Sequence, residues 1–102
     1  ASSGNMYHNP KTGLKTYFLS FEDGARLEIM SRPDIAGRPQ DQYLKGYVHL
    51  AFSLGSKEAV DYLTKRLAAD GFNILGGPRT TGDGYYESTA EDLDGNVIEL
   101  TV

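Results

Sequence analysis

The sequence predicts an α+β fold built from two related modules, the second complete and the first incomplete. The signature D-G-x-x-x-E occurs twice, at residues 23–28 and 94–99, with Asp94 lying 71 positions after Asp23. One stretch, residues 56–70, has apolar residues at helical spacing, whereas the other apolar runs are short and favour strands. The second copy therefore reads as β-α-β-β-β, and the first supplies the last three strands of that pattern.

Each copy of the signature places a carboxylate inside a strand. The Asp-Gly turn starts a short apolar strand, and Glu28 or Glu99 stands four residues after the glycine. A carboxylate among residues that favour burial is costly unless it has a function. We therefore interpret the two copies as a duplicated unit whose equivalent strands bring equivalent carboxylates to one site.

The first module, residues 1–31, consists of turns and strands. Residues 9–13 form a turn, residues 14–21 are rich in β-formers, and residues 22–24 close a hairpin into a strand over residues 25–31. Ala1 corresponds to the point where the second copy leaves its helix. We therefore expect the first module to lack its opening strand and helix in this sequence.

A linker joins the two modules of what we expect to be a single domain. Residues 32–45 contain two prolines and a glycine and few apolar residues. In the second module, residues 46–102, Ser56 can cap the helix and Gly71 can end it. The strands expected in this module cover residues 47–52, 72–75, 85–91 and 97–102.

Composition limits the classes of partner. The net charge is −4 and acidic and basic residues are interspersed, so the sequence has no basic stripe for nucleic acid or for an anionic membrane. No apolar run approaches the length that spans a bilayer, and the first residues lack the features of a signal peptide, so we expect a cytoplasmic protein. With no cysteine, any metal site must use nitrogen and oxygen ligands.

Strand parity places three potential ligands on open faces. Side chains two positions apart share one face of a strand. If Leu50 packs under the helix, His49 points to the opposite face, and if Leu100 packs there too, Glu99 joins His49. The same rule turns Glu28 away from the packed layer of its own strand.

Several segments resemble the vicinal oxygen chelate superfamily, which includes glyoxalase I, bleomycin-resistance proteins, fosfomycin-resistance enzymes and extradiol dioxygenases. Residues 46–52 (GYVHLAF), the helix after them and residues 91–100 (EDLDGNVIEL) resemble its second module. Residues 17–30 (YFLSFEDGARLEIM) resemble the end of its first module. The resemblance implies paired βαβββ modules whose curved, mixed sheet forms a cup around a divalent metal.

The resemblance also implies a site. Metal ligands in glyoxalase I-like members come from the first and last strands of each module, and the matching positions here are Glu28, His49 and Glu99. A fourth ligand would come from the missing first strand, and water could fill open positions around Ni, Zn, Co or Mn.

This site implies a reaction as well. Such a metal stabilises the enediolate of a small-molecule substrate with two vicinal oxygens, and Glu99 would be the catalytic base. We thus expect a metal-dependent lyase or isomerase acting on a substrate such as a 2-oxoaldehyde hemithioacetal, while no residue run identifies a thiol cofactor site.

Other interpretations stay open. His49 could be a hydrogen-bonded structural residue, Glu99 could pair with a lysine or arginine across the sheet, and Arg26 could neutralise Glu28 on their shared face. The function could also be that of a metal-free, bleomycin-resistance-type binding protein, or of a thiol transferase of the fosfomycin-resistance type. The strand over residues 25–31 would have an unpaired edge with apolar residues, which predicts a homodimer, or a complex with a separate N-terminal piece that covers this strand.

Overall fold

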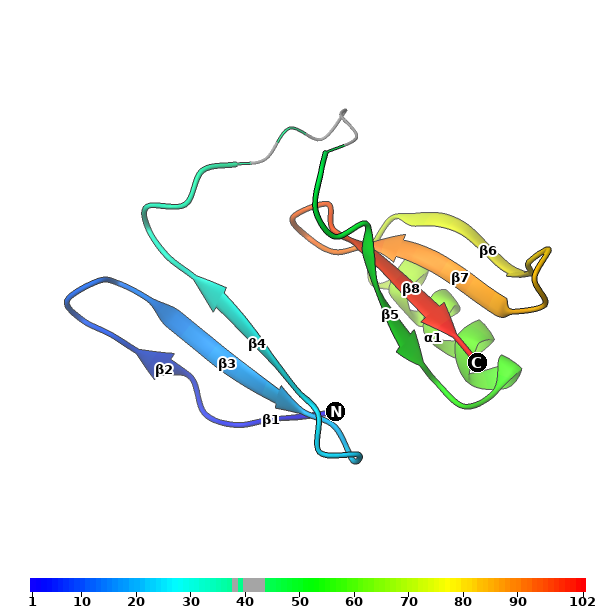
Figure 1. Ribbon diagram of the computed structural model, residues 1–102, viewed down its shortest axis with the longest axis horizontal. Helices are drawn as coiled ribbons and strands as arrows, with labels where there is room; N and C mark the ends of the chain where they lie inside the picture. The colour runs from blue at the N-terminus through cyan, green and yellow to red at the C-terminus, as the bar shows by residue number, and fades with distance from the viewer. Residues whose placement is uncertain (38, 40–43) are drawn as a thin grey trace. The chain divides into compact units, whose positions relative to one another are not determined.

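The computed structural model describes residues 1–37, 39 and 44–102, and the chain divides into two compact units, Ala1–Pro39 and Gln40–Val102. The expected linker over residues 32–45 falls partly on residues 38 and 40–43, which lie outside the described residues. Figure 1 shows the strands and the helix of the two units. No helix in the described part of the chain is both long and apolar enough to cross a membrane.

The first unit is an antiparallel sheet centred on strand β3. Its strands are β1 (Ser2–Ser3), β2 (Tyr7–His8), β3 (Lys15–Ser20) and β4 (Arg26–Ser31). β1 and β2 pair with successive stretches of β3, and β4 also pairs with β3. The hairpin between β3 and β4 closes where the backbone N–H of Gly24 donates to the carbonyl of Phe21 at 3.0 Å.

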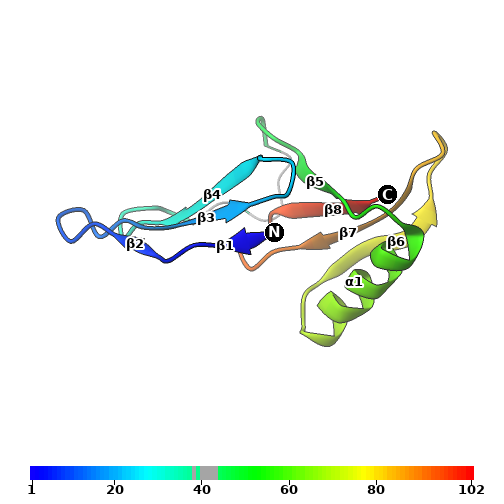
Figure 2. The ribbon, with the colours of Figure 1, turned by 90° about the horizontal axis from the view of Figure 1, so that it is seen from below.

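The second unit is a mixed sheet with a helix on one face. Its elements are β5 (His49–Ser53), α1 (Lys57–Ala69), β6 (Ile74–Thr80), β7 (Tyr86–Glu91) and β8 (Val97–Thr101). The strand order is β5-β8-β7-β6, and β5 runs parallel to β8 whereas the other pairs are antiparallel. Figure 2 shows α1 lying along one face of this sheet. The prediction of an α+β fold is confirmed.

The helix α1 begins and ends where the sequence predicts. The backbone N–H of Ala59 donates to Ser56 Oγ at 3.2 Å, which satisfies one of the free donors of the first turn. Asp70 is the C-cap, and Gly71 follows with φ +91°, a conformation that glycine adopts without steric cost. Val60, on the buried side of α1, is fully buried against the sheet.

Strand β6 is longer than the expected strand over residues 72–75. A proline inside a run of strand-forming residues argues against a strand, so the sequence predicted no continuation of this strand beyond residue 75. In the structure β6 continues through Pro78 to Thr80. The structure accommodates it on an edge strand with register shifts between Ile74 and Arg79. Gly77 lies within this bulge at φ +82°, and a Cβ there would come 2.6 Å from the carbonyl oxygen of Glu87.

The two copies of the signature have the same strand pairing. In the first unit Thr16 pairs with Met30 and Phe18 with Glu28. Adding 71 to each number gives the pairs Glu87 with Thr101 and Thr89 with Glu99, which are the pairs observed between β7 and β8. All the β3–β4 pairs from 16–30 to 20–26 recur in this way. The internal repeat that the sequence predicts is therefore present in the backbone hydrogen bonding.

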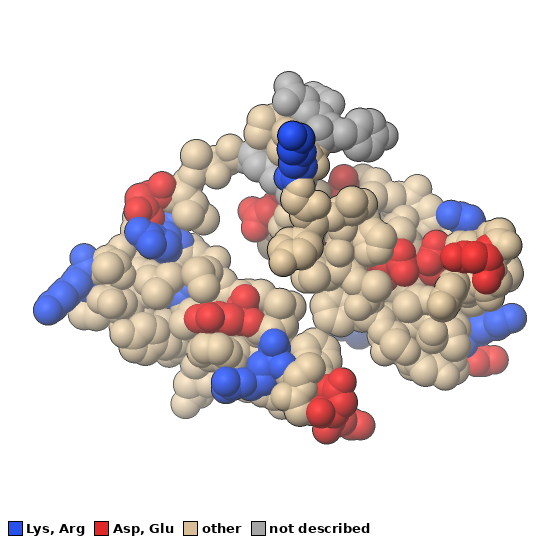
Figure 3. All heavy atoms as spheres, viewed as in Figure 1, with Lys and Arg blue, Asp and Glu red and all other residues tan. Residues whose placement is uncertain are grey.

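Burial differs between the units. Among the described residues, the buried apolar side chains are Val60, Ala90 and Leu100, all in the second unit. Thr16 is the buried residue that the structure records in the first unit, at 4% exposure. Figure 3 shows Lys and Arg side chains interspersed with Asp and Glu over the viewed face. Among the described residues, the buried apolar core therefore lies in the second unit, which carries α1.

Candidate functional site

The second sheet has one face packed on α1 and one face that the helix leaves open. Ser88 of β7 points to the helix, because its Oγ lies 2.6 Å from Thr64 Oγ1 of α1. Leu100 pairs with Ser88 and shares that face. Alternation along the strands then places Glu87 and Glu99 on the opposite face, which we call the open face.

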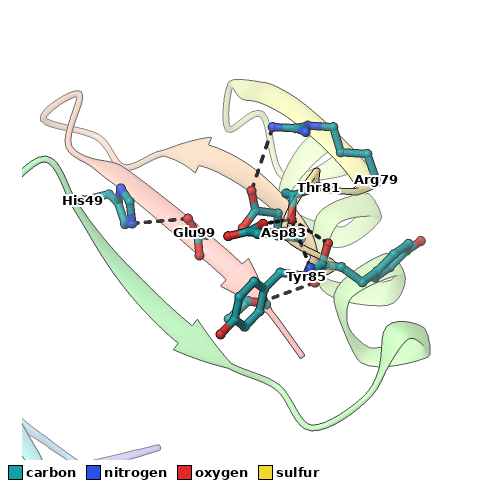
Figure 4. Close-up of polar contacts among 9 residues, drawn as sticks. His49, Arg79, Thr81, Asp83, Tyr85 and Glu99 are labelled. Atoms are coloured by element: carbon teal, nitrogen blue, oxygen red, sulfur yellow. Dashed lines mark hydrogen bonds and ion pairs between the residues drawn. The ribbon is translucent and has the colours of Figure 1, made fainter.

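His49 and Glu99 contact each other on the open face. His49 Nε2 lies 3.2 Å from Glu99 Oε2, and Figure 4 shows the two side chains directed toward one another from β5 and β8. His49 pairs with Val97 in the parallel register, so its contact with Glu99 is diagonal between adjacent strands. The Glu99 side chain is only 17% exposed and that of His49 is 38% exposed. Parity therefore predicted correctly that these two residues share a face.

Glu87 is a third member of this cluster, and the sequence interpretation missed it. Burial and then the negative charge of nearby Glu99 raise the pKa of Glu87. Arg79 Nη2 lies 3.9 Å from Glu87 Oε1 and opposes that rise in pKa (Figure 4). The side chains of Arg79, Glu87, Glu99 and His49 thus form a polar row across all four strands of the sheet.

The remaining candidate, Glu28, lies on β4 in the first unit. Its Oε1 accepts a hydrogen bond from Thr16 Oγ1 at 3.0 Å. The guanidinium of Arg26 lies over the ring of Phe18, 5.0 Å from its centroid. Within the described residues Arg26 and Glu28 form no ion pair, so the structure does not support neutralisation of Glu28 by Arg26.

The potential ligand atoms on the open face suit a divalent metal of intermediate hardness. An imidazole nitrogen and a carboxylate oxygen are ligand types that Zn, Ni, Co and Mn accept. His49 and Glu99 supply one of each and already face each other, so they fit as two ligands of one ion. In the described part of the chain, no three His, Cys, Asp or Glu side chains gather in a group that could hold a metal ion. The set of Glu28, His49 and Glu99 stays a prediction.

Comparison with known proteins shows what the chain is similar to. Residues 4–100 match the family model described as the Glyoxalase/Bleomycin resistance protein/Dioxygenase superfamily. The uncharacterized protein YqjT of Bacillus subtilis is 41% identical over 58 residues, which is 54% of this chain and 45% of that protein. The chain therefore matches less than half the length of this relative.

Several solved structures have a similar fold. A glyoxalase family protein from Enterococcus faecalis superposes with a TM-score of 0.74 at 22% identity, covering 98% of this chain and 76% of that chain. A putative glyoxalase from Bacillus halodurans gives 0.67 at 24% identity, covering 98% and 74%. The fosfomycin resistance protein FosX from Listeria monocytogenes gives 0.62 at 24% identity, covering 99% and 71%. The family-model match over residues 4–100 confirms the family resemblance read from the sequence, and the solved structures confirm the fold.

Proposed function

Because the chain belongs to the Glyoxalase/Bleomycin resistance protein/Dioxygenase superfamily, we propose that it is a glyoxalase I-like, metal-dependent lyase or isomerase. Its proposed substrate is a small molecule with two vicinal oxygens, such as the hemithioacetal of a 2-oxoaldehyde. The contact between His49 and Glu99 on the open face carries this proposal, since it joins an imidazole nitrogen to a carboxylate. The superfamily commonly uses divalent metals, and this pair has the chemistry to bind one.

In this proposal His49, Glu99 and Glu28 have different tasks. His49 and Glu99 bind the metal, and Glu28 contributes a further carboxylate. When bound, the metal polarises the vicinal oxygens and acidifies the adjacent C–H. Glu99 then takes the proton from one carbon and returns it to the neighbouring carbon. The Glu99 side chain is restrained for this task, because β8 is paired on both sides and the side chain is largely buried.

Metal titration tests the ligand assignment. We expect the wild-type protein to bind Ni²⁺, Co²⁺, Zn²⁺ or Mn²⁺, and His49→Ala and Glu99→Gln each to weaken that binding, as measured by isothermal titration calorimetry. His8→Ala is the matched control, because His8 is an exposed histidine on β2 of the first unit. Unchanged affinity in both open-face variants would contradict the assignment.

Product analysis separates this activity from its alternatives. The metal-loaded protein is assayed with a hemithioacetal, a catechol, and an epoxide together with a thiol. Isomerisation of the hemithioacetal supports the proposed activity, whereas addition of the thiol to the epoxide supports a thiol transferase. A protein that binds bleomycin tightly and turns over none of these substrates would instead be a binding protein.

We also propose that the protein is a homodimer. Among the described residues β4 pairs with β3 alone, and β4 carries Ile29 and Met30, which are 46% and 55% exposed. An unpaired apolar edge strand favours pairing with another chain. Light scattering at micromolar concentration should give the mass of a dimer, and the amides of β4 should exchange slowly. A well-folded monomer with fast-exchanging β4 amides would refute the dimer.

A further inference from the structure

Arg26 lies on the face of the first sheet that carries Glu28, and its partner there is an aromatic ring. Arg26 and Glu28 are two positions apart on β4, so they share a face, and Phe18 of β3 pairs directly with Glu28 on that face. The guanidinium carbon of Arg26 lies 5.0 Å from the centroid of the Phe18 ring. Arg26 and Glu28 are exposed and Phe18 is 40% exposed, so all three side chains are accessible.

The positive charge of Arg26 is not compensated by an acid. In the part of the chain that the structure describes, Arg26 makes no hydrogen bond and no ion pair, although Glu28 shares its face. Glu28 has another partner, because its Oε1 accepts a hydrogen bond from Thr16 Oγ1 at 3.0 Å. An aromatic ring attracts a cation through its π electrons but carries no net negative charge. The guanidinium of Arg26 therefore keeps both its charge and its N–H donors for a ligand.

The second copy of the repeat has no such pair. Adding 71 to the numbers of Phe18 and Arg26 gives Thr89 and Val97, which occupy the equivalent places in β7 and β8. In the four strands of the second sheet, all of them described, the one basic residue is Arg79, whose Nη2 lies 3.9 Å from a glutamate oxygen of β7. A carboxylate therefore opposes its charge. Between the two copies, the uncompensated arginine is a feature of the first.

We propose that Arg26, held by the ring of Phe18, binds a carboxylate of the substrate and so selects anionic compounds among those with two vicinal oxygens. This inference rests on the proposed function, in which Glu28 on the same face belongs to the site. The planar guanidinium matches a carboxylate with two parallel hydrogen bonds. The ring restricts the arginine side chain before the ligand arrives, which reduces the entropy lost on binding. Glu28 repels an anion only weakly from its exposed position, because water and salt screen the two charges.

The test compares substrates that differ in charge. The metal-loaded protein is assayed with a neutral hemithioacetal from methylglyoxal and 2-mercaptoethanol. A second substrate carries a carboxylate on its thiol half (methylglyoxal with 3-mercaptopropionate), and a third carries one on its aldehyde half (4,5-dioxopentanoate with 2-mercaptoethanol). We expect kcat/KM to be about 10-fold higher for at least one charged substrate, because hydrogen bonds to a charged group contribute that much. Arg26→Gln should remove this preference, and the two charged substrates show which half carries the recognised group.

Three further variants separate recognition by Arg26 from a general effect of charge. Arg26→Lys keeps the charge but loses the planar fork, and should retain only part of the preference. Phe18→Leu removes the ring that holds the guanidinium and should also reduce the preference. Arg79→Gln is the control, because it removes a positive charge that already faces a glutamate, and should keep the preference. A loss in Arg79→Gln as large as that in Arg26→Gln would overturn the inference, and thermal unfolding confirms that each variant is folded.

A second measurement needs neither metal nor turnover. The ¹H–¹⁵N resonance of Arg26 Nε is assigned by its absence from the spectrum of Arg26→Gln. The metal-free protein is then titrated with 3-(methylthio)propionate, which should shift this resonance, and with the neutral 3-(methylthio)propionamide, which should not. If the protein isomerises no hemithioacetal but Arg26 responds to the carboxylate, the proposed function fails and the anion site stands. If hemithioacetals are isomerised without a preference that depends on Arg26, or the carboxylate leaves its resonance unchanged, the inference is overturned.

Discussion

The two copies of the repeat share a backbone but differ in what covers it. The face of β7 and β8 that carries Ser88, Ala90 and Leu100 is buried under α1. The equivalent side chains of β3 and β4 include Tyr17 and Ile29, which are 40% and 46% exposed in a unit that has no helix among its described residues. The register of a hairpin is set locally by its Asp-Gly turn, whereas burial depends on a distant segment. The repeat therefore preserves strand pairing even where packing differs.

The open faces of the two copies differ in chemistry as well. Glu99 meets His49 from the parallel strand β5 and Glu87 from β7. Glu28 has Thr16 as its partner, and its direct cross-strand neighbour is Phe18, over which Arg26 lies. The second copy thus combines a histidine and two glutamates, while the first presents one carboxylate among apolar and aromatic groups. In the proposed function this difference assigns the chemical step to the second copy.

The largest expected effect compares the two glutamates directly. Glu99→Gln should lower the rate of hemithioacetal isomerisation by about 100-fold or more, the usual contribution of a positioned base. Glu28→Gln should lower kcat less, because Glu28 acts only as a ligand in the proposed site. Steady-state kinetics at saturating metal measure both. Equal losses of kcat, or a larger loss in Glu28→Gln, would remove the distinction between the copies.

The next effect concerns the helix-covered face. Thr64→Val should lower the free energy of unfolding by about 1–3 kcal/mol, because Ser88 is 2% exposed and would lose its hydroxyl partner. Adding Ser88→Ala should recover part of this loss, since both polar groups are then gone. Urea unfolding measures the two variants, with the exposed Ser20→Ala in the first unit as the control. A double variant that is as unstable as the sum of its single variants would show that the two hydroxyls do not interact.

A smaller effect tests the start of α1, the element that distinguishes the second unit. Ser56→Ala should destabilise the protein by about 1 kcal/mol, because the N–H of Ala59 loses its acceptor. Ser56→Asp should retain most of the stability, since an aspartate can also cap the helix. Hydrogen exchange should show faster opening of α1 in Ser56→Ala and little change in β3. Equal acceleration in both units would mean that they unfold as one cooperative structure.

The smallest effect is a pH dependence at the contact between α1 and β7. Tyr86 donates its hydroxyl to Asp61 Oδ1 at 2.5 Å, and this bond raises the pKa of Tyr86. A raised pKa means that the folded state holds the tyrosine proton more tightly than the unfolded state does. The hydrogen bond therefore stabilises the fold fully below the unfolded tyrosine pKa of about 10, and this stabilisation is lost as pH rises through the folded pKa. Tyr86→Phe should therefore lower the unfolding midpoint at pH 7, and the difference from wild type should shrink in alkaline solution. A difference that stays constant from neutral to strongly alkaline pH would contradict this account.

The sequence by itself determined the repeat, the α+β class, the limits of α1 and the shared face of His49 and Glu99. These features follow from local rules: a cap, a turn, and the alternation of side chains along a strand. Only the tertiary structure decided that Glu87 is the diagonal cross-strand neighbour of Glu99, and that β6 continues through Pro78. Parity tells which face a residue occupies, but the neighbour that it meets there depends on the register between strands. Between β7 and β8 that register is set by the hairpin turn, whereas between β5 and β8 it is set by hydrogen bonds between segments far apart in the chain, and the alternation of side chains along one strand specifies neither.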